Sequence, residues 1–352
     1  MWKFLHSEML VILALTENAG RTDAEIADLY GLKKGTVSSI RRRLLDAGAI
    51  YYACVPSFGR LGCEMLGFHY GTTDPAVRHE TKANHYMEFC NESPQIFHAL
   101  IGGSSIFFFT ALKNATDLES FAQHHNAFFS GTRRPSKAKL SIVIFPFSLS
   151  KITAVPQYAG IVHSYFQLDV PMPRYAPMVT VRHDPAELSS VEKKILSTIV
   201  SNPSATDRQV ASIVKLSRQG VTRIRNKLVE EELLRNICIP RLYRWGFEIY
   251  AVAHPRFRIE VGWDKRIRSQ PRDIMERSFY VLSKADESVG NFMVPKFTEY
   301  SEKLDNVLAW YHKIKAFEDP PELIVFSLDR STELRNFDFA PAVSHLLIPQ
   351  KE

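Results

Sequence analysis

Apolar residues repeat at helical spacing in the first part of the chain. Val37, Ile40 and Leu44 stand three and then four residues apart, which predicts a helix with one buried stripe. The helix is expected to begin at about Lys34 and to end at residues 46–48. Its opposite face is polar and basic, so the pattern predicts a helix that packs on one side and presents charge on the other.

The same pattern returns 184 residues later. The segment TDAEIADLYGLKKGTVSSIRRRLLDAGAIYYACVPSFGRLGCE, from Thr22, aligns without a gap with TDRQVASIVKLSRQGVTRIRNKLVEEELLRNICIPRLYRWGFE, from Thr206. Identical pairs include Thr22 and Thr206, Asp23 and Asp207, Val37 and Val221, Arg41 and Arg225, Leu44 and Leu228, and Gly62 and Gly246. This agreement predicts an internal duplication.

Each copy begins with a helix-start signal. Thr22 followed by Glu25, and Thr206 followed by Gln209, have the spacing of a capping box, in which the hydroxyl and the longer side chain satisfy backbone amides reciprocally. A short turn leads to the basic helix, for which Ser217 is a suitable N-cap in the second copy. Residues 49–55 then predict a wing strand, closed by a turn over residues 56–62. Helix, turn, basic helix and wing together predict a winged helix-turn-helix, a module that reads DNA.

Strand-like runs follow each copy. In the first half they cover residues 64–73, 94–103, 105–113 and 140–147, with helical patterns at residues 80–91 and 117–128. In the second half they cover residues 248–257, 278–285, 291–297 and 322–328, with a clear helix at residues 299–314 and a weaker one near residues 263–277. The order βαββαβ predicts an α+β protein in which two winged helix-turn-helix domains alternate with two ferredoxin-like domains.

The domain boundaries follow from this order. We expect a first winged helix at residues 1–64, a first α/β domain at 65–165, a linker at 166–186, a second winged helix at 187–247 and a second α/β domain at 248–352. The linker holds prolines at positions 171, 173, 177 and 185, and proline removes backbone donors and disfavours regular structure.

The basic helices supply the candidate DNA contacts. Polar and basic side chains on the outer face of a recognition helix reach base edges, while flanking cations neutralise phosphates. In the first copy the groove residues are Lys34, Ser38, Ser39 and Arg42, with Lys33 and Arg43 on the backbone; in the second they are Arg218, Thr222, Arg223 and Asn226, with Lys227 on the backbone. The competing interpretation is a merely solvated helix surface. Arg41 and Arg225 lie nearer the apolar stripe, so we expect structural roles for both.

Composition narrows the class of protein. The 352 residues carry a net charge of +6, which is compatible with a polyanionic partner. The four cysteines form no CxxC pair, so they predict reduced, mostly buried thiols rather than disulfides or a zinc site. Glu8 and Glu17 interrupt the apolar N-terminal stretch, and no run reaches the ~20 apolar residues of a membrane span. We therefore expect a cytoplasmic protein with no membrane partner.

The chain resembles the leucine-responsive regulator (Lrp/AsnC) family of transcription factors, in tandem. The passages that carry the resemblance are LSRQGVTRIRNKL, AGAIYYACVPSFGRLG and ALIGGSSIFFFTALKNATDLESFAQ. It implies a winged helix followed by a ferredoxin-like ligand and dimerisation domain, with double-stranded DNA and a second copy of the chain as partners. Ile40 and Ile224 stand where family members usually carry Arg, and the glycine loop reads Gly102-Gly-Ser-Ser105, so the resemblance names no effector.

Two other functions remain open. Siroheme decarboxylases look like this family and can occur as fused pairs, and His69, His85, His98, His124, His125, His254 and His312 would be available for such chemistry. Because no HExxH motif, nucleophile elbow or phosphate loop accompanies them, we expect no catalytic residue, no metal site and no cofactor. We expect His124 and His125 to share a partly exposed helix face. The aromatic runs at residues 107–109 and 128–129 could form a protein-binding surface, although bulk of this kind is typical of a core.

Overall fold

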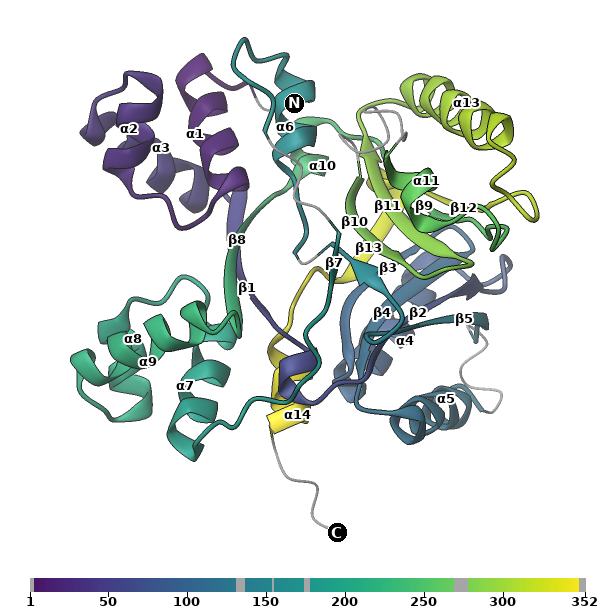
Figure 1. The fold of residues 1–352 in the computed structure, drawn as a ribbon, viewed down its shortest axis with the longest axis horizontal. Helices are drawn as coiled ribbons and strands as arrows, with labels where there is room; N and C mark the ends of the chain where they lie inside the picture. Colours follow the sequence, from purple (N-terminus) through teal and green to yellow (C-terminus); the bar gives the residue numbers. More distant parts are fainter. Residues whose placement is uncertain (1–2, 131–136, 154, 174–177, 269–277, 348–352) are drawn as a thin grey trace. The chain divides into compact units, whose positions relative to one another are not determined.

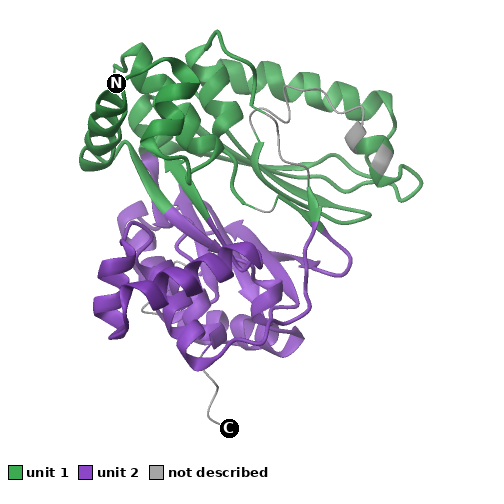
Figure 2. Ribbon diagram, turned by 60° about the vertical axis from the view of Figure 1, so that its left-hand side comes forward, with its two compact units in different colours: residues 1–52, 151–179, 236–329 green, residues 53–150, 180–235, 330–352 purple. Residues whose placement is uncertain are grey.

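The computed structural model describes residues 3–130, 137–153, 155–173, 178–268 and 278–347 (Figure 1). The chain forms two compact units (Figure 2). Unit 1 contains residues 1–52, 151–179 and 236–329, and unit 2 contains residues 53–150, 180–235 and 330–352. Each unit therefore combines the helices of one winged-helix copy with the α/β domain from the other half of the chain.

Unit 1 holds the first helix-turn-helix and the second α/β domain. Its helices are α1 (His6–Glu17), α2 (Asp23–Tyr30), α3 (Lys34–Asp46), α6 (Ala159–Phe166), α10 (Leu242–Trp245), α11 (Trp263–Arg268) and α13 (Phe297–Lys313). Its sheet is formed by β6 (Lys151–Ile152), β9 (Ile249–His254), β10 (Ser278–Ser283), β11 (Ser288–Val294) and β12 (Glu322–Ser327), with the short β7 (Val179–Thr180) reaching the unit boundary.

Unit 2 holds the second helix-turn-helix and the first α/β domain. Its helices are α4 (His79–Glu92), α5 (Ala115–Phe128), α7 (Ser190–Ser201), α8 (Asp207–Val214), α9 (Arg218–Glu230) and α14 (Ala340–Leu347), with short 3-10 turns η1 (Gly59–Leu61) and η2 (Leu328–Arg330), the second of which crosses the boundary. Its sheet contains β2 (Met65–Thr72), β3 (Ile96–Gly102), β4 (Ser105–Leu112), β5 (Lys139–Pro146) and β13 (Ser331–Arg335).

The two α/β domains share one strand order. The described strands run β12-β9-β11-β10 in unit 1 and β5-β2-β4-β3 in unit 2, and neighbouring strands are antiparallel. This is the order of a ferredoxin-like βαββαβ fold, because the first and third strands lie in the centre. The predicted fold class, two winged helix-turn-helix domains with two ferredoxin-like domains, is confirmed.

Each sheet is extended by a segment from the end of the opposite half of the chain. β6, which follows the first α/β domain, pairs with β10 of unit 1, where Leu282 faces Ile152. β13, which follows the second α/β domain, pairs with β3 of unit 2, where Thr332 faces Ile101. Sequence order had placed both segments in the α/β domain that precedes them. Instead, each segment pairs through its backbone with the open edge of the sheet formed by the other half of the chain.

The wing strands also differ from the expected form. β1 (Ile50–Pro56) and β8 (Leu234–Pro240) form a two-stranded sheet with one another (Figure 1). The N–H of Ser57 donates to the carbonyl of Leu233 at 3.0 Å, and that of Arg241 donates to the carbonyl of Ala49 at 2.9 Å. The expected turn after β1 is present, and Gly62 occupies the left-handed region with φ 90°, where a side chain would be strained. The strands of the two copies thus satisfy each other's backbone groups.

The aromatic runs of the first α/β domain lie in its core. Phe107, Phe108 and Phe109 on β4 are fully buried, and Phe128 and Phe129 at the end of α5 are nearly so. The packing interpretation of these residues is therefore confirmed. The four cysteines are free and buried, as expected.

Candidate nucleic-acid interface

The helix-turn-helix copies are held by the predicted caps. Thr22 Oγ1 accepts from the N–H of Glu25 at 3.2 Å, and Thr206 Oγ1 accepts from that of Gln209 at 3.4 Å, with the reciprocal bonds also present. Ser217 Oγ accepts from the N–H of Gly220 at 3.1 Å and so caps α9. These bonds satisfy amides that a helix start would otherwise leave without a partner. Both capping boxes and the Ser217 cap are confirmed.

The inner arginine of each recognition helix is tied to the fold. Arg41 Nε lies 2.7 Å from Asp23 Oδ1, and its Nη2 donates to the carbonyl of Arg21 at 2.7 Å. Arg225 Nε lies 2.6 Å from Asp207 Oδ1, and its Nη2 donates to the carbonyl of Ala205 at 3.2 Å. Each pair joins the recognition helix to the first residue of the helix before it. The expected structural role of both arginines is confirmed.

The outer face of α3 is open. Lys33, Lys34, Ser38, Ser39, Arg42 and Arg43 are all exposed, whereas Val37, Ile40 and Leu44 are buried. Within the described residues, Arg42 forms no ion pair. Arg43 does, because its Nη2 lies 2.6 Å from Oε1 of the buried Glu8 on α1. The structure therefore keeps five of the six predicted residues free of ion pairs and commits Arg43 to the packing of α1.

The outer face of α9 is only partly open. Arg218, Arg223 and Asn226 are exposed. Thr222 is half-buried, and its hydroxyl donates to Asp207 Oδ2 at 2.6 Å, so it is already engaged inside the unit. Lys227 Nζ lies 2.6 Å from Glu192 Oε1 on α7. Three of the five predicted residues of α9 are thus available to a ligand without breaking a bond.

The partners of Arg43 and Lys227 were missed by the sequence analysis. Glu8 and Glu192 stand in the first turns of α1 and α7, the helices that precede each capping box. Ser189 and Glu192 have the spacing of a further capping box, so the sequence could have predicted the position of Glu192 at the start of α7. The Lys227 ammonium and the Ser189 bonds lower the pKa of Glu192 to about 2. No comparable spacing pointed to Glu8, because it stands in an apolar run that does not indicate an ion pair with Arg43.

The wing residues have partners inside their units. The Tyr51 ring lies beneath the Arg241 guanidinium at 5.2 Å, and the Tyr52 hydroxyl accepts from Arg41 at 3.1 Å. Burial raises the pKa of Tyr52 to about 12. Arg235 pairs with Glu232 at 2.9 Å on an exposed part of the surface. In the structure these side chains therefore contact other residues of the protein at the wing strands.

Among the described residues, the histidines take part in no group of three or more potential metal ligands. His98 Nδ1–H donates to the carbonyl of Arg335 at 3.0 Å, and His254 contacts Glu287 at 2.9 Å. His69 bonds Thr110 at 2.9 Å, and burial lowers the pKa of its imidazole to about 3. His85 and His124 are partly exposed, and His312 is exposed. His125 is buried, so the expectation that it shares a partly exposed face with His124 was wrong; it turns inward toward Tyr86 and Phe129.

Comparison with known proteins identifies one module by sequence. Residues 188–235, which contain α7, α8 and α9, match a family of winged helix-turn-helix DNA-binding domains. No curated protein matches the chain by sequence. Among the described helices, none is long and apolar enough to cross a membrane.

Solved structures resemble the chain at low sequence identity. The crystal structure of the siroheme decarboxylase NirDL has a TM-score of 0.53 and 12% identity, and covers 97% of this chain and 98% of its own. The leucine response regulatory protein of Mycobacterium tuberculosis has a TM-score of 0.31 and 18% identity over 40% of this chain and 92% of its own. An AsnC family transcriptional regulator from Agrobacterium tumefaciens has a TM-score of 0.33 and 12% identity, over 40% of this chain and 89% of its own. The full-length similarity defines the fold, and the chain contains a winged helix-turn-helix of the DNA-binding kind.

Proposed function

We propose that the protein is a transcriptional regulator that binds double-stranded DNA with two non-identical recognition helices, α3 and α9, in one chain. The observation that carries the proposal is the division of roles on each helix. The inner arginine, Arg41 or Arg225, is tied to the fold, whereas the outer arginine, Arg42 or Arg223, is exposed and free of ion pairs within the described residues. The sequence match of residues 188–235 to DNA-binding winged helices supports the same assignment for α9.

The exposed side chains fit duplex DNA chemically. Arg and Lys bind phosphate oxygens or the guanine edge, Asn binds the adenine edge, and Ser donates or accepts at either. α3 offers Ser38, Ser39 and Arg42, whereas α9 offers Arg223 and Asn226. Because the two sets differ, we propose an asymmetric target rather than a palindrome.

Selection from a pool of random duplexes tests this proposal. The full chain is expected to enrich a site with two unlike halves. Arg42→Ala should relax the preference in one half and Arg223→Ala in the other. Lys313→Ala, which removes one exposed charge from α13, is the matched control and should leave the selected site unchanged. Enrichment of a perfect palindrome, relaxed by only one of the two substitutions, would exclude the asymmetric target.

We also propose that the chain forms a homodimer through its ferredoxin-like domains. β5 and β12 stand at the ends of their sheets in the described strand order. Each edge exposes apolar side chains, with Ile142 at 42% and Val325 at 38% exposure. Such edges pair readily with another strand. Light scattering should give twice the mass of the chain, and Val325→Lys should lower the measured mass toward that of one chain. A monomer at high protein concentration would contradict the dimer.

A second candidate function is tetrapyrrole chemistry of the kind named for NirDL. A cavity of 450 Å³ in unit 2 is lined by His69 and His125, with Lys137 and Lys139 beside them. The Nδ1 atom of His69 is buried and has no hydrogen-bond partner in the described part of the chain, and the lysines suit the carboxylates of such a ligand. Addition of siroheme is the test: a Soret shift that is lost in His69→Gln would favour this function. An unchanged spectrum would leave DNA binding as the only proposal.

A further inference from the structure

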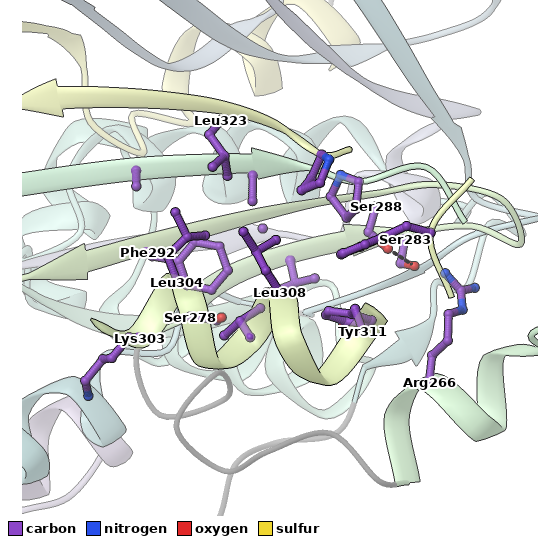
Figure 3. A pocket seen from close by; sticks show the side chains of 18 of the residues that line it. Arg266, Ser278, Ser283, Ser288, Phe292, Lys303, Leu304, Leu308, Tyr311 and Leu323 are labelled. Atoms are coloured by element: carbon purple, nitrogen blue, oxygen red, sulfur yellow. Dashed lines mark hydrogen bonds between the residues drawn. The ribbon is translucent and has the colours of Figure 1, made fainter. Parts of the chain in front are cut away.

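Unit 1 contains a cavity between its sheet and α13 (Figure 3). The cavity measures 130 Å³ and lies within unit 1, where the second ferredoxin-like domain supplies its lining except for Met178, which precedes β7. On the helix side it is lined by one apolar stripe, formed by Tyr300, Leu304, Val307, Leu308 and Tyr311. Of the residues of α13, Tyr311 alone is buried. The apolar face of this long helix therefore borders the cavity instead of packing closely on the sheet.

Small residues on the sheet line the cavity. Ala251, Ala253 and Gly290 face the cavity from β9 and β11. In unit 2 the space between the sheet and α4 is filled by large rings, including Tyr86, Phe89 and Phe108, all fully buried, and the cavity of that unit lies beside α5. The two ferredoxin-like domains thus share a strand order, but of these two cavities that of unit 1 has the more apolar lining. An apolar cavity of about 150 Å³ accommodates benzene, so this one suits a single ring or a short branched chain.

One end of the cavity is polar. Arg266 on α11 lies there beside Ser283 and Ser288, whose hydroxyls bond one another (Figure 3). Arg266 is 3% exposed, and its guanidinium lies 4.1 Å from the ring centre of Phe257. Its Nη2 donates to the carbonyls of Lys284 and Ala285, at 3.2 and 2.9 Å. Its Nε is buried and has no hydrogen-bond acceptor among the residues that the structure describes.

The charge at this end is compensated only in part. Within the described residues Arg266 forms no ion pair, although a buried cation ordinarily has one. Glu287 is committed to His254 and Lys284, at 2.9 and 2.5 Å. Asp286 is exposed and influences Arg266 only through longer-range Coulomb attraction. Among the described residues, no carboxylate therefore lies within ion-pair distance of Arg266, and a ligand carboxylate would supply that partner.

The structure assigns this cavity as a binding site for a small apolar monocarboxylate, whose ring or branched chain fills the space between β9, β11 and α13 and whose carboxylate pairs with Arg266. A guanidinium with a free Nε–H binds a carboxylate strongly because both the charge and the donor match. An α-amino acid fits less well, because its ammonium would lie beside the Arg266 cation. The site is independent of the proposed DNA contacts.

Isothermal titration of the full chain with phenylacetate tests the assignment. Two matched probes accompany it: 2-phenylethanol has the ring without the charge, and phenylalanine adds the ammonium. Phenylacetate is expected to bind, and both other compounds at least tenfold more weakly. A result in which none of the three binds, or in which 2-phenylethanol binds as tightly as phenylacetate, overturns the proposal.

Two substitutions separate binding in the cavity from binding elsewhere. Ala253→Leu fills the space from β9 and should abolish binding while the protein stays folded, as judged by its thermal transition. Arg266→Lys keeps a positive charge but removes the Nε–H and the planar fork, and should weaken binding about tenfold or more. Lys303→Ala, which alters a lysine at the opposite end of the cavity, should have a smaller effect. Undiminished binding in Ala253→Leu would place the ligand outside the cavity and contradict the proposal.

Discussion

Arg225 on α9 pairs with Asp207, the first residue of α8, at 2.6 Å between Nε and Oδ1. Asp207 also accepts from the hydroxyl of Thr222 at 2.6 Å, one helical turn before Arg225. One carboxylate therefore fixes two positions of the recognition helix. Its pKa is lowered by hydrogen bonds from Thr222 and Arg225, which outweigh the opposing effect of burial. The angle between α8 and α9 rests on this cluster, and the outer face of α9 is presented as a consequence.

Removal of the inner arginine should cost stability. Arg225→Ala leaves Asp207 partly buried without its cation, and breaking such a pair costs about 1–3 kcal/mol. Urea unfolding should therefore show a lower free energy of unfolding than in the wild type. Arg223→Ala, two residues earlier and exposed, is the matched control and should change that free energy by less than about 0.5 kcal/mol. Equal losses in both variants would refute the division of roles.

The N-cap of the helix before each recognition helix should contribute to stability independently of the inner arginine. Thr206→Ala removes the acceptor for the N–H of Gln209 and should destabilise unit 2 by about 1 kcal/mol. Thr206→Ser retains the hydroxyl and should preserve most of the stability. Hydrogen exchange at α8 measures the effect locally. Faster exchange in Thr206→Ser than in Thr206→Ala would contradict the cap.

His69 should make stability depend on pH. Burial lowers its pKa from 6.5 to about 3, so the folded protein keeps it neutral while the unfolded chain takes up a proton below pH 6.5. Stability is thus lost as pH falls from 6.5 toward 3, by up to about 1.4 kcal/mol per pH unit. His69→Gln should lose less stability than the wild type between pH 7.5 and 5.0 in urea unfolding. Parallel pH profiles for the two proteins would show that His69 titrates normally.

Lys227 and Arg43 should contribute less to DNA affinity than the neighbouring arginines that form no ion pair among the described residues. Each already pairs with a glutamate of the preceding helix, at 2.6 Å in both cases. Lys227→Met should therefore reduce the affinity for duplex DNA by less than threefold. Arg223→Ala should reduce that affinity at least tenfold, because loss of one base contact costs about 1–3 kcal/mol of binding free energy. Fluorescence anisotropy compares the two variants. The reverse order of effects would show that the ion pair with Glu192 opens on DNA.

Local signals predicted the modules well. The capping boxes, the buried stripe of Val37, Ile40 and Leu44, and the inward position of Arg41 depend on spacing along one or two helices. The strand order of both α/β domains also followed from the alternation of strand and helix patterns. These features are determined by neighbours in the sequence, so the sequence alone could reveal them.

Long-range pairing was beyond such signals. The two residues of β6 and the five of β13 look like ordinary linker or loop, and only a distant sheet edge gives them strand structure. The cavity under α13 was equally hidden, because Ala253 and Gly290 are unremarkable strand residues until the opposite helix is placed. The engagement of the Thr222 hydroxyl by Asp207 depends on the angle between two helices, which spacing does not determine.

The central claim is that both recognition helices bind DNA through their exposed arginines. The most direct measurement is the affinity of the full chain for a selected duplex across a salt series, with Arg42→Ala, Arg223→Ala and Lys313→Ala in parallel. Affinity should fall steeply with salt, since each phosphate contact contributes a slope of about −0.9. Arg42→Ala and Arg223→Ala should each weaken binding, and Lys313→Ala should not. Undetectable binding at low salt, or losses no larger than that of Lys313→Ala, would contradict the account.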